Sequence, residues 1–248
     1  MSETERRATA YFGLVYILTI PFWTLGAALD VRLLPGLPIS ALAVVVPTLA
    51  AGIITFADGG RLALAPLLAR ALDYRRADWR LFIAVLINPV LFGLAFLALR
   101  LSSADIPDPS FDVTEAVMLF ALFLPCALLE ELGWSGYALD RLQTHRSPLV
   151  AGLVLGGVWA AWHYPALAEV GRSIEWIVWW SVWTLSARII MVWLYNWTNA
   201  SVFAVALYHA ISNLCWQMFP VHGTYFDPKI SAIITLALAL LLMIRRST

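Results

Sequence analysis

"RLFIAVLINPVLFGLAFLALRL", residues 80–101, decides the fold class of this chain. A helix of about 20 apolar residues crosses the ~30 Å hydrocarbon core of a bilayer. Such runs recur along the chain, because 61% of its residues are hydrophobic and only 13% are charged. A soluble domain has roughly 45–50% apolar and about 25% charged residues. We therefore expect a polytopic membrane protein.

Eight apolar runs are candidate spans. They cover residues 9–29, 38–57, 80–101, 114–138, 148–165, 174–197, 200–219 and 229–245. The alternation of barrel strands is absent, so we interpret every run as a helix. Pro165 is expected to end the fifth helix, and the first run is interpreted as a retained span rather than a cleaved signal. The expected fold is an all-α transmembrane bundle of about eight spans, in one domain over residues 1–248.

The positive charges indicate the orientation of the bundle. With the N-terminus inside, eleven cationic residues fall on inner segments and four on outer segments. This bias predicts that both termini are cytoplasmic. The expected location is a bacterial or archaeal plasma membrane. Stretch 59–80 fits either a basic helix on the inner leaflet or an ordinary cytoplasmic loop. The inner set is Arg6, Arg7, Arg61, Arg70, Arg75, Arg76, Arg80, Arg141, Arg146, Arg245 and Arg246, and the outer set is Arg32, Arg100, Arg172 and Lys229.

Net charge and cysteine usage exclude several classes of site. The formal net charge is zero, so bulk electrostatics give no basis for binding nucleic acid. The two cysteines, Cys126 and Cys215, lie in separate apolar runs. They form neither a disulfide framework nor a metal-type Cys spacing.

Six polar side chains interrupt the fourth to seventh spans. Ionisable groups near the bilayer centre cost roughly 2.5–3.5 kcal/mol on insertion scales, and they usually face a bundle interior or a watery cavity. One such residue alone is readily explained as a packing hydrogen bond between spans. Six on four consecutive helices predict one shared site in the core of these spans. They are Glu130, Glu131, His163, Arg188, His209 and Asn213.

The spacing of these residues suggests different roles. Glu130 and Glu131 are consecutive, so on a helix they point about 100° apart and cannot share one role. His209 and Asn213 are four residues apart and lie on one helix face. A carboxylate with two His side chains supplies a general base, a water-positioning group and an oxyanion donor. The same three groups also match a two-His, one-carboxylate zinc site, and the residues alone leave both options open.

Three motifs carry a resemblance to a known family. "EELGWSGYALDRL" begins at Glu130, "WAAWH" ends at His163, and "HAISN" runs from His209 to Asn213. In this order, and on separate predicted helices, they resemble the motifs of the CAAX protease and bacteriocin-processing (CPBP) family of intramembrane proteases. The resemblance covers about residues 110–217, which we expect to form a protease-like core. The first three spans resemble the family only as generic apolar helices.

The resemblance implies an intramembrane endopeptidase and a role for each motif residue. Glu130 would be the general base that deprotonates the attacking water, and His163 would hold that water with it. His209 and Asn213 would stabilise the oxyanion of the tetrahedral intermediate. Many members are called metalloproteases, but the family's structural picture favours a glutamate-activated water without a cofactor. Zinc at Glu130, His163 and His209 is the alternative.

One position departs from the family pattern. The family usually has Arg four residues after the second acid, where this chain has Ser135. Ser135 offers Glu131 only a hydrogen bond, and an unpaired buried carboxylate needs another cation. Arg188 in the middle of the sixth span is otherwise hard to justify. We predict that Arg188 pairs with Glu131 from a neighbouring helix and that Glu131, Arg188 and Ser135 together support the site.

Two other functions compete with the endopeptidase. A non-catalytic member acting as a membrane scaffold or bacteriocin-immunity protein is favoured by Ser135 alone. A proton-coupled transporter also uses intramembrane Glu, His and Arg, but an inverted repeat is not recognisable in the sequence. The expected partners are the lipid bilayer and a membrane-associated protein or peptide substrate, with no nucleic acid.

Overall fold

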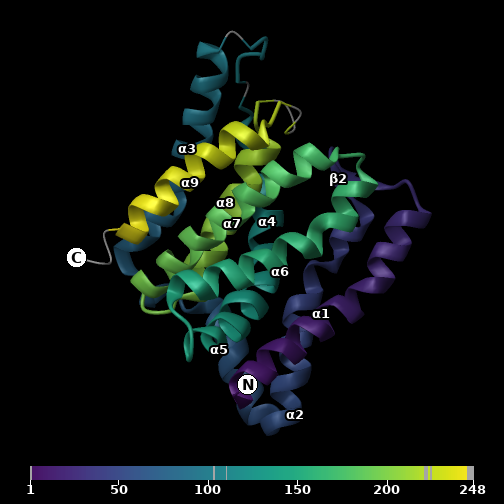
Figure 1. The fold of residues 1–248 in the computed structure, drawn as a ribbon, viewed down its shortest axis with the longest axis vertical. Coiled ribbons are helices and arrows are strands. Elements are labelled where there is room, and N and C mark those ends of the chain that lie inside the picture. The colour runs from purple at the N-terminus through teal and green to yellow at the C-terminus, as the bar shows by residue number, and fades with distance from the viewer. Residues whose placement is uncertain (1, 103, 110, 221–222, 224, 245–248) are drawn as a thin grey trace.

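The computed structural model describes residues 2–102, 104–109, 111–220, 223 and 225–244. Within these residues the chain is a bundle of helices with one very short strand pair (Figure 1). The predicted all-α membrane fold is therefore confirmed. Arg245 and Arg246, which contributed to the charge bias, lie outside the described residues.

Six helical stretches in the described residues are long and apolar enough to cross a membrane, which makes the chain an integral membrane protein. The α-helices within them are α1 (Glu3–Ala28), α2 (Val46–Ala69), α3 (Leu81–Leu101), α4 (Val113–Gly133), α6 (Pro148–Glu169) and α7 (Ile174–Trp197). Two further apolar helices, α8 (Val202–Gln217) and α9 (Pro228–Ile244), have 16 and 17 residues. The estimate of about eight spans therefore includes two helices shorter than a full span. Asn199 and Ala200 have left-handed backbone, so α8 begins only at Val202.

The connection from α1 to α2 contains the strands. β1 (Arg32–Leu34) pairs antiparallel with β2 (Leu37–Pro38), and a 3-10 helix (Ile39–Val45) leads into α2. Gly36 takes the left-handed conformation that this tight turn needs, with φ of 74°. The predicted run 38–57 begins within one residue of this helical stretch, which starts at Ile39, but the hairpin before it was not predicted.

Stretch 59–80 is helical but broken. α2 kinks at Gly59 and Gly60, where the backbone leaves the helical region. The helix then continues to Ala69, and three 3-10 turns (Arg70–Leu72, Tyr74–Arg76 and Asp78–Arg80) lead into α3. One continuous interfacial helix is therefore not formed.

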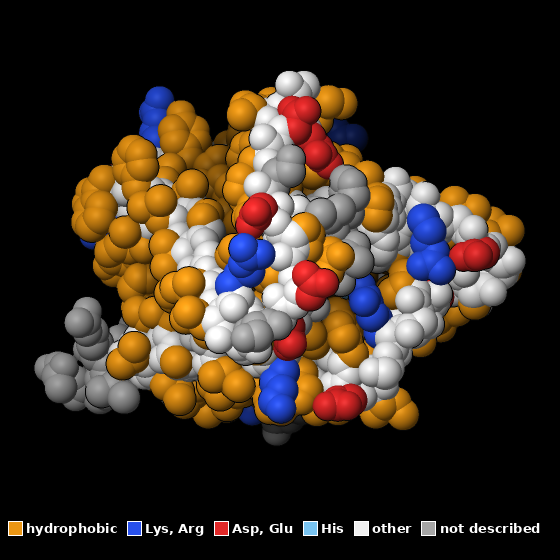
Figure 2. All heavy atoms as spheres, turned by 90° about the horizontal axis from the view of Figure 1, so that it is seen from above, with side chains coloured by type: hydrophobic (Ala, Val, Ile, Leu, Met, Phe, Trp, Pro, Cys, Tyr) orange, Lys and Arg blue, Asp and Glu red, His pale blue; other side chains and the backbone are white. Residues whose placement is uncertain are grey.

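Helix α7 lies at the centre of the bundle and positions the site. In its most apolar window 61% of the residues are buried, against 17% in that of α1. α7 packs on α6 and α9, while α8 packs on α3 and α4. Outer helices keep large apolar side chains exposed, such as Ile17 on α1 and Phe82 on α3. Seen from above, charged side chains gather over the middle of one end and hydrophobic side chains cover much of the flanks (Figure 2).

Two helix details around the motifs differ from expectation. α6 continues through Pro165 to Glu169, so the predicted end at this proline is wrong. A proline removes one backbone hydrogen bond, but a helix can continue through it when its packing holds. α4 is followed directly by a buried π-helical segment, Trp134–Leu139, and by the short helix α5 (Asp140–Gln143). Such wider turns are rare and occur frequently at functional sites.

Candidate active site

The second acid of the pair, Glu131, is held by three side chains from three helical segments. Both terminal nitrogens of Arg188 on α7 donate to its two carboxylate oxygens, at 2.8 and 3.1 Å. Ser135 Oγ in the π-helical segment donates to Oε2 at 2.5 Å. His209 Nδ1 on α8 lies 3.1 Å from Oε1. The predicted contact between Arg188 and Glu131 is therefore present, and both side chains are fully buried.

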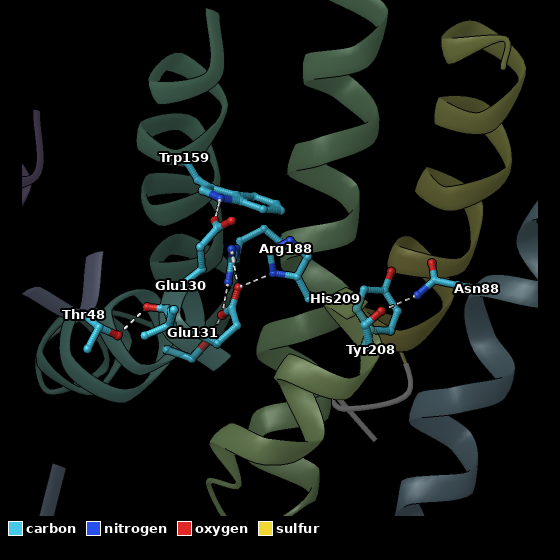
Figure 3. A network of polar contacts seen from close by, with 10 residues as sticks. Thr48, Asn88, Glu130, Glu131, Trp159, Arg188, Tyr208 and His209 are labelled. Carbon is cyan, nitrogen blue, oxygen red and sulfur yellow. Dashed lines mark hydrogen bonds and ion pairs between the residues drawn. The ribbon is translucent and has the colours of Figure 1, made fainter. Parts of the chain in front are cut away.

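The first acid, Glu130, has a different environment. It is 7% exposed, and its Oε2 accepts a hydrogen bond from the indole Nε1 of Trp159 on α6 at 3.0 Å. Figure 3 shows the two carboxylates diverging, with that of Glu130 directed to the indole and that of Glu131 to Arg188 and His209. This divergence agrees with the angle of about 100° between consecutive helical residues.

His163 is fixed through its own helix. Its Nδ1 lies 2.8 Å from the backbone oxygen of Trp159, one turn earlier. A carbonyl oxygen only accepts hydrogen bonds, so Nδ1 carries the proton, and Nε2 of the neutral ring is left as an acceptor. The ring packs against those of Trp159, Trp162 and Trp180. Three indoles thus set its orientation.

His209 and Asn213 lie one turn apart on α8. Side chains of neighbouring helices donate hydrogen bonds to the backbone next to His209 and next to Glu130. Asn88 on α3 donates to the backbone oxygen of Tyr208, next to His209, at 2.9 Å. Thr48 on α2 donates to the backbone oxygen of Leu129, next to Glu130. These two bonds, visible in Figure 3, attach α8 and α4 to the outer helices beside the site residues.

Gly133 lets α4 approach α2 closely just after the two acids. A Cβ placed there would lie 2.4 Å from backbone atoms of Pro47 and 2.5 Å from the hydroxyl of Tyr11. Every larger residue would push α4 away from α1 and α2. The small residue in the first motif therefore has a packing role in this chain.

A cavity of about 460 Å³ collects the candidate catalytic residues. Glu130, His163, His209 and Asn213 all line it, together with Trp159 and mostly apolar side chains from α4, α6, α7, α8 and the region of the β1–β2 hairpin. Glu131, Arg188 and Ser135 instead lie fully or almost fully buried behind this wall. The site thus has an accessible part and a closed part.

The positions of Glu130, His163 and His209 bear on the zinc alternative. Among the described residues no three His, Cys, Asp or Glu side chains form a group that could hold a metal ion. One oxygen of Glu130 is engaged by Trp159, and Nδ1 of His163 by its own helix. Glu130, His163 and His209 therefore do not fit a shared zinc ion in this arrangement.

Several cavity residues were not identified from the sequence as part of the site. Gln217 lines the cavity and is eight residues after His209, so the spacing of four could have been extended by one turn. Cys126 lines it one turn before Glu130, by the same spacing. Arg172, between α6 and α7, also lines the cavity, and its guanidinium lies 4.5 Å from the ring centre of Trp176. Burial lowers the pKa of this guanidinium.

Comparisons with known proteins match the region that carries the motifs. Residues 112–215 match the family model Type II CAAX prenyl endopeptidase Rce1-like. "CAAX prenyl protease 2" of Methanococcus maripaludis is 31% identical over 117 residues, which are 44% of this chain and 43% of that relative. This part of the chain is therefore similar to the Rce1-like CAAX prenyl endopeptidases. The match spans less than half the length of the relative. The part of the chain that matches the family model contains α4, α6, α7 and nearly all of α8.

Proposed function

We propose that this chain is a member of the CPBP family and an intramembrane endopeptidase that hydrolyses a peptide bond of a membrane-associated protein or peptide. One observation carries the proposal: Glu130, His163, His209 and Asn213 line a single cavity, while the adjacent acid is neutralised behind it. The match to the Rce1-like family model and the name of the methanococcal relative, a prenyl protease, support the same reaction.

The first chemical step is the activation of water. Glu130 takes a proton from a water molecule, and Nε2 of His163 accepts the hydrogen bond of its other proton. The water oxygen forms a bond to the carbonyl carbon of the peptide, whose oxygen becomes an oxyanion. The protein thus supplies an oriented nucleophile inside a largely apolar cavity.

The second step is the collapse of the tetrahedral intermediate. The Asn213 amide and Nε2–H of His209 donate to the oxyanion. Nδ1 of His209 lies 3.1 Å from the Glu131 carboxylate, and this contact holds the ring in the cavity wall. The C–N bond then breaks, and Glu130 returns its proton to the departing amine. The products are a carboxylic acid and an amine, so atoms and charge balance.

The reaction as proposed uses no metal. The scaffold alternative rested on Ser135, and Arg188 supplies the cation that Ser135 cannot. We propose further that both termini face the cytoplasm and that the substrate contributes an apolar segment, because most residues that line the cavity are apolar. A prenylated C-terminal peptide is one substrate of this kind, suggested by the name of the relative.

The decisive experiment measures cleavage of a fluorogenic membrane-peptide panel, with and without prenyl groups, by purified protein in liposomes. Glu130→Gln is expected to lower kcat at least about 1,000-fold, because the general base is lost together with the position of its water. Glu175→Gln, on the exposed first turn of α7, is the matched control and should retain activity. Retained cleavage by Glu130→Gln would refute the assignment, and loss of activity in chelator, restored by zinc, would refute the metal-free step.

A further inference from the structure

Trp159 contacts four charged or titratable side chains at the centre of the site. Its Nε1 donates to Glu130, and the guanidinium carbon of Arg188 lies 4.1 Å from its ring centre. The rings of His163 and His209 meet the indole edge-on, with centres 5.3 and 5.2 Å away. The side chain is 7% exposed, so these contacts are shielded from water.

The indole of Trp159 contacts Glu130 directly and reaches Glu131 through Arg188. Among the described residues it provides the hydrogen bond that holds Glu130, and this donor carries no charge. The cation, Arg188, lies over the face of the ring and uses both terminal nitrogens on Glu131. A guanidinium is able to bind either carboxylate in the same forked geometry. Stacking of the Arg188 guanidinium on the indole face favours the position in which Arg188 binds Glu131.

We propose that Trp159 is a positioning residue that keeps the two adjacent acids distinct. Its N–H fixes one oxygen of Glu130 and leaves the other oxygen for the attacking water, and its ring face confines Arg188 to Glu131. The inference deepens the proposed function, since it rests on Glu130 acting as the base. It is specific to this side chain: a phenylalanine would keep an aromatic face for Arg188 and lose the donor.

Trp159→Phe tests the donor, and Tyr16→Phe is its control. Tyr16 on α1 does not line the cavity, and its hydroxyl donates to the backbone oxygen of Val158, next to Trp159, at 2.9 Å. We expect Trp159→Phe to lower kcat about tenfold or more with KM within about twofold, because a hydrogen bond to a charged group is lost beside the reacting water. Tyr16→Phe should lower kcat by less than about threefold, because it removes a bond between neutral groups that do not line the cavity. Equal losses in the two variants, or a wild-type kcat in Trp159→Phe, would overturn the proposal.

A second measurement does not depend on activity. In protein labelled with 15N-tryptophan, the indole N–H resonance of Trp159 is assigned by its loss in Trp159→Phe. The resonance of Trp162, whose N–H donates to Thr19, is assigned by its loss in Trp162→Phe. Glu130→Ala should move the Trp159 resonance and leave the Trp162 resonance in place. An unmoved Trp159 resonance would overturn the positioning role even if the protein cleaves peptides. A moved resonance in a protein without any Glu130-dependent cleavage would support the contact and refute the proposed function instead.

Discussion

Glu130 lies in the cavity wall, and the next residue, Glu131, lies in the buried ion-pair region that it forms with Arg188, Ser135 and His209. The two regions differ in exposure, charge and hydrogen bonding. Glu130 in the wall has one neutral donor and faces open space. Glu131 in the ion-pair region has a cation, a hydroxyl and an imidazole, with no exposed surface. One residue step along a helix is therefore enough to separate a group available for chemistry from a group that holds helices together.

The largest predicted effect is the removal of the cation. Arg188→Met leaves the Glu131 carboxylate buried without its ion pair, and we expect the free energy of unfolding to fall by about 3–5 kcal/mol. Denaturant unfolding in detergent measures this. Arg32→Met removes a partly exposed pair with Asp30 and is expected to cost less than about 1 kcal/mol. Similar costs for the two variants would show that the buried pair is not special.

The double variant Glu131→Met with Arg188→Met sharpens that test. Replacing a whole buried ion pair with apolar side chains is often nearly neutral. We expect the double variant to be more stable than Arg188→Met alone, measured in the same unfolding experiment. A double variant that is less stable than the single one would indicate that Glu131 is stabilised mainly by Ser135 and His209.

The next effect compares the two acids directly. Glu131→Gln leaves Arg188 as an unpaired buried charge and is expected to cost about 2–4 kcal/mol of folding stability. Glu130→Gln keeps an acceptor for Trp159 and should stay within about 1 kcal/mol of wild type. Thermal unfolding followed by circular dichroism is the measurement. A reversed order of stability would break the distinction between the wall and the ion-pair region.

A smaller effect is predicted for Ser135. Ser135→Ala removes a hydrogen bond to a carboxylate that keeps its cation, so we expect a loss of about 1–2 kcal/mol. Ser186→Ala is the control, because this buried hydroxyl donates only to a backbone oxygen of its own helix, Val182. Its expected cost is below about 1 kcal/mol. A cost for Ser135→Ala no larger than that of the control would show that the hydroxyl adds nothing to the ion pair.

The smallest perturbation uses the two cysteines as probes of access to the cavity wall. Cys126 lines the cavity and Cys215 lies between the hydrophobic clusters of the bundle. With the other cysteine replaced by Ser, a thiosulfonate reagent should modify Cys126 about tenfold faster than Cys215, because access governs the rate. Mass spectrometry gives both rates, and faster labelling of Cys215 would place the accessible face elsewhere.

The sequence allowed contacts to be predicted for charged residues, because a charge inside a membrane span needs an oppositely charged partner. Arg188 in a span required a carboxylate, and Glu131 without the family arginine required a cation, so their contact could be predicted. The direction of an indole N–H has no such constraint, so the bond from Trp159 to Glu130 was not predicted. The contact of His209 with Glu131, the hairpin and the passage of α6 through Pro165 depend on packing between segments far apart in the chain, which local patterns do not encode.

The Arg188–Glu131 pair also bears on how the protein is made. Its two partners are 57 residues apart in the chain. At a synthesis rate of about 5–20 residues per second, Arg188 is therefore synthesised roughly 3–11 s after Glu131. During this interval α4 presents two acids without the arginine, and α7 later presents an arginine that is costly in lipid. The nascent chain must therefore keep α4 within reach of the insertion machinery until α7 arrives, and the two helices enter the bilayer most favourably as a pair.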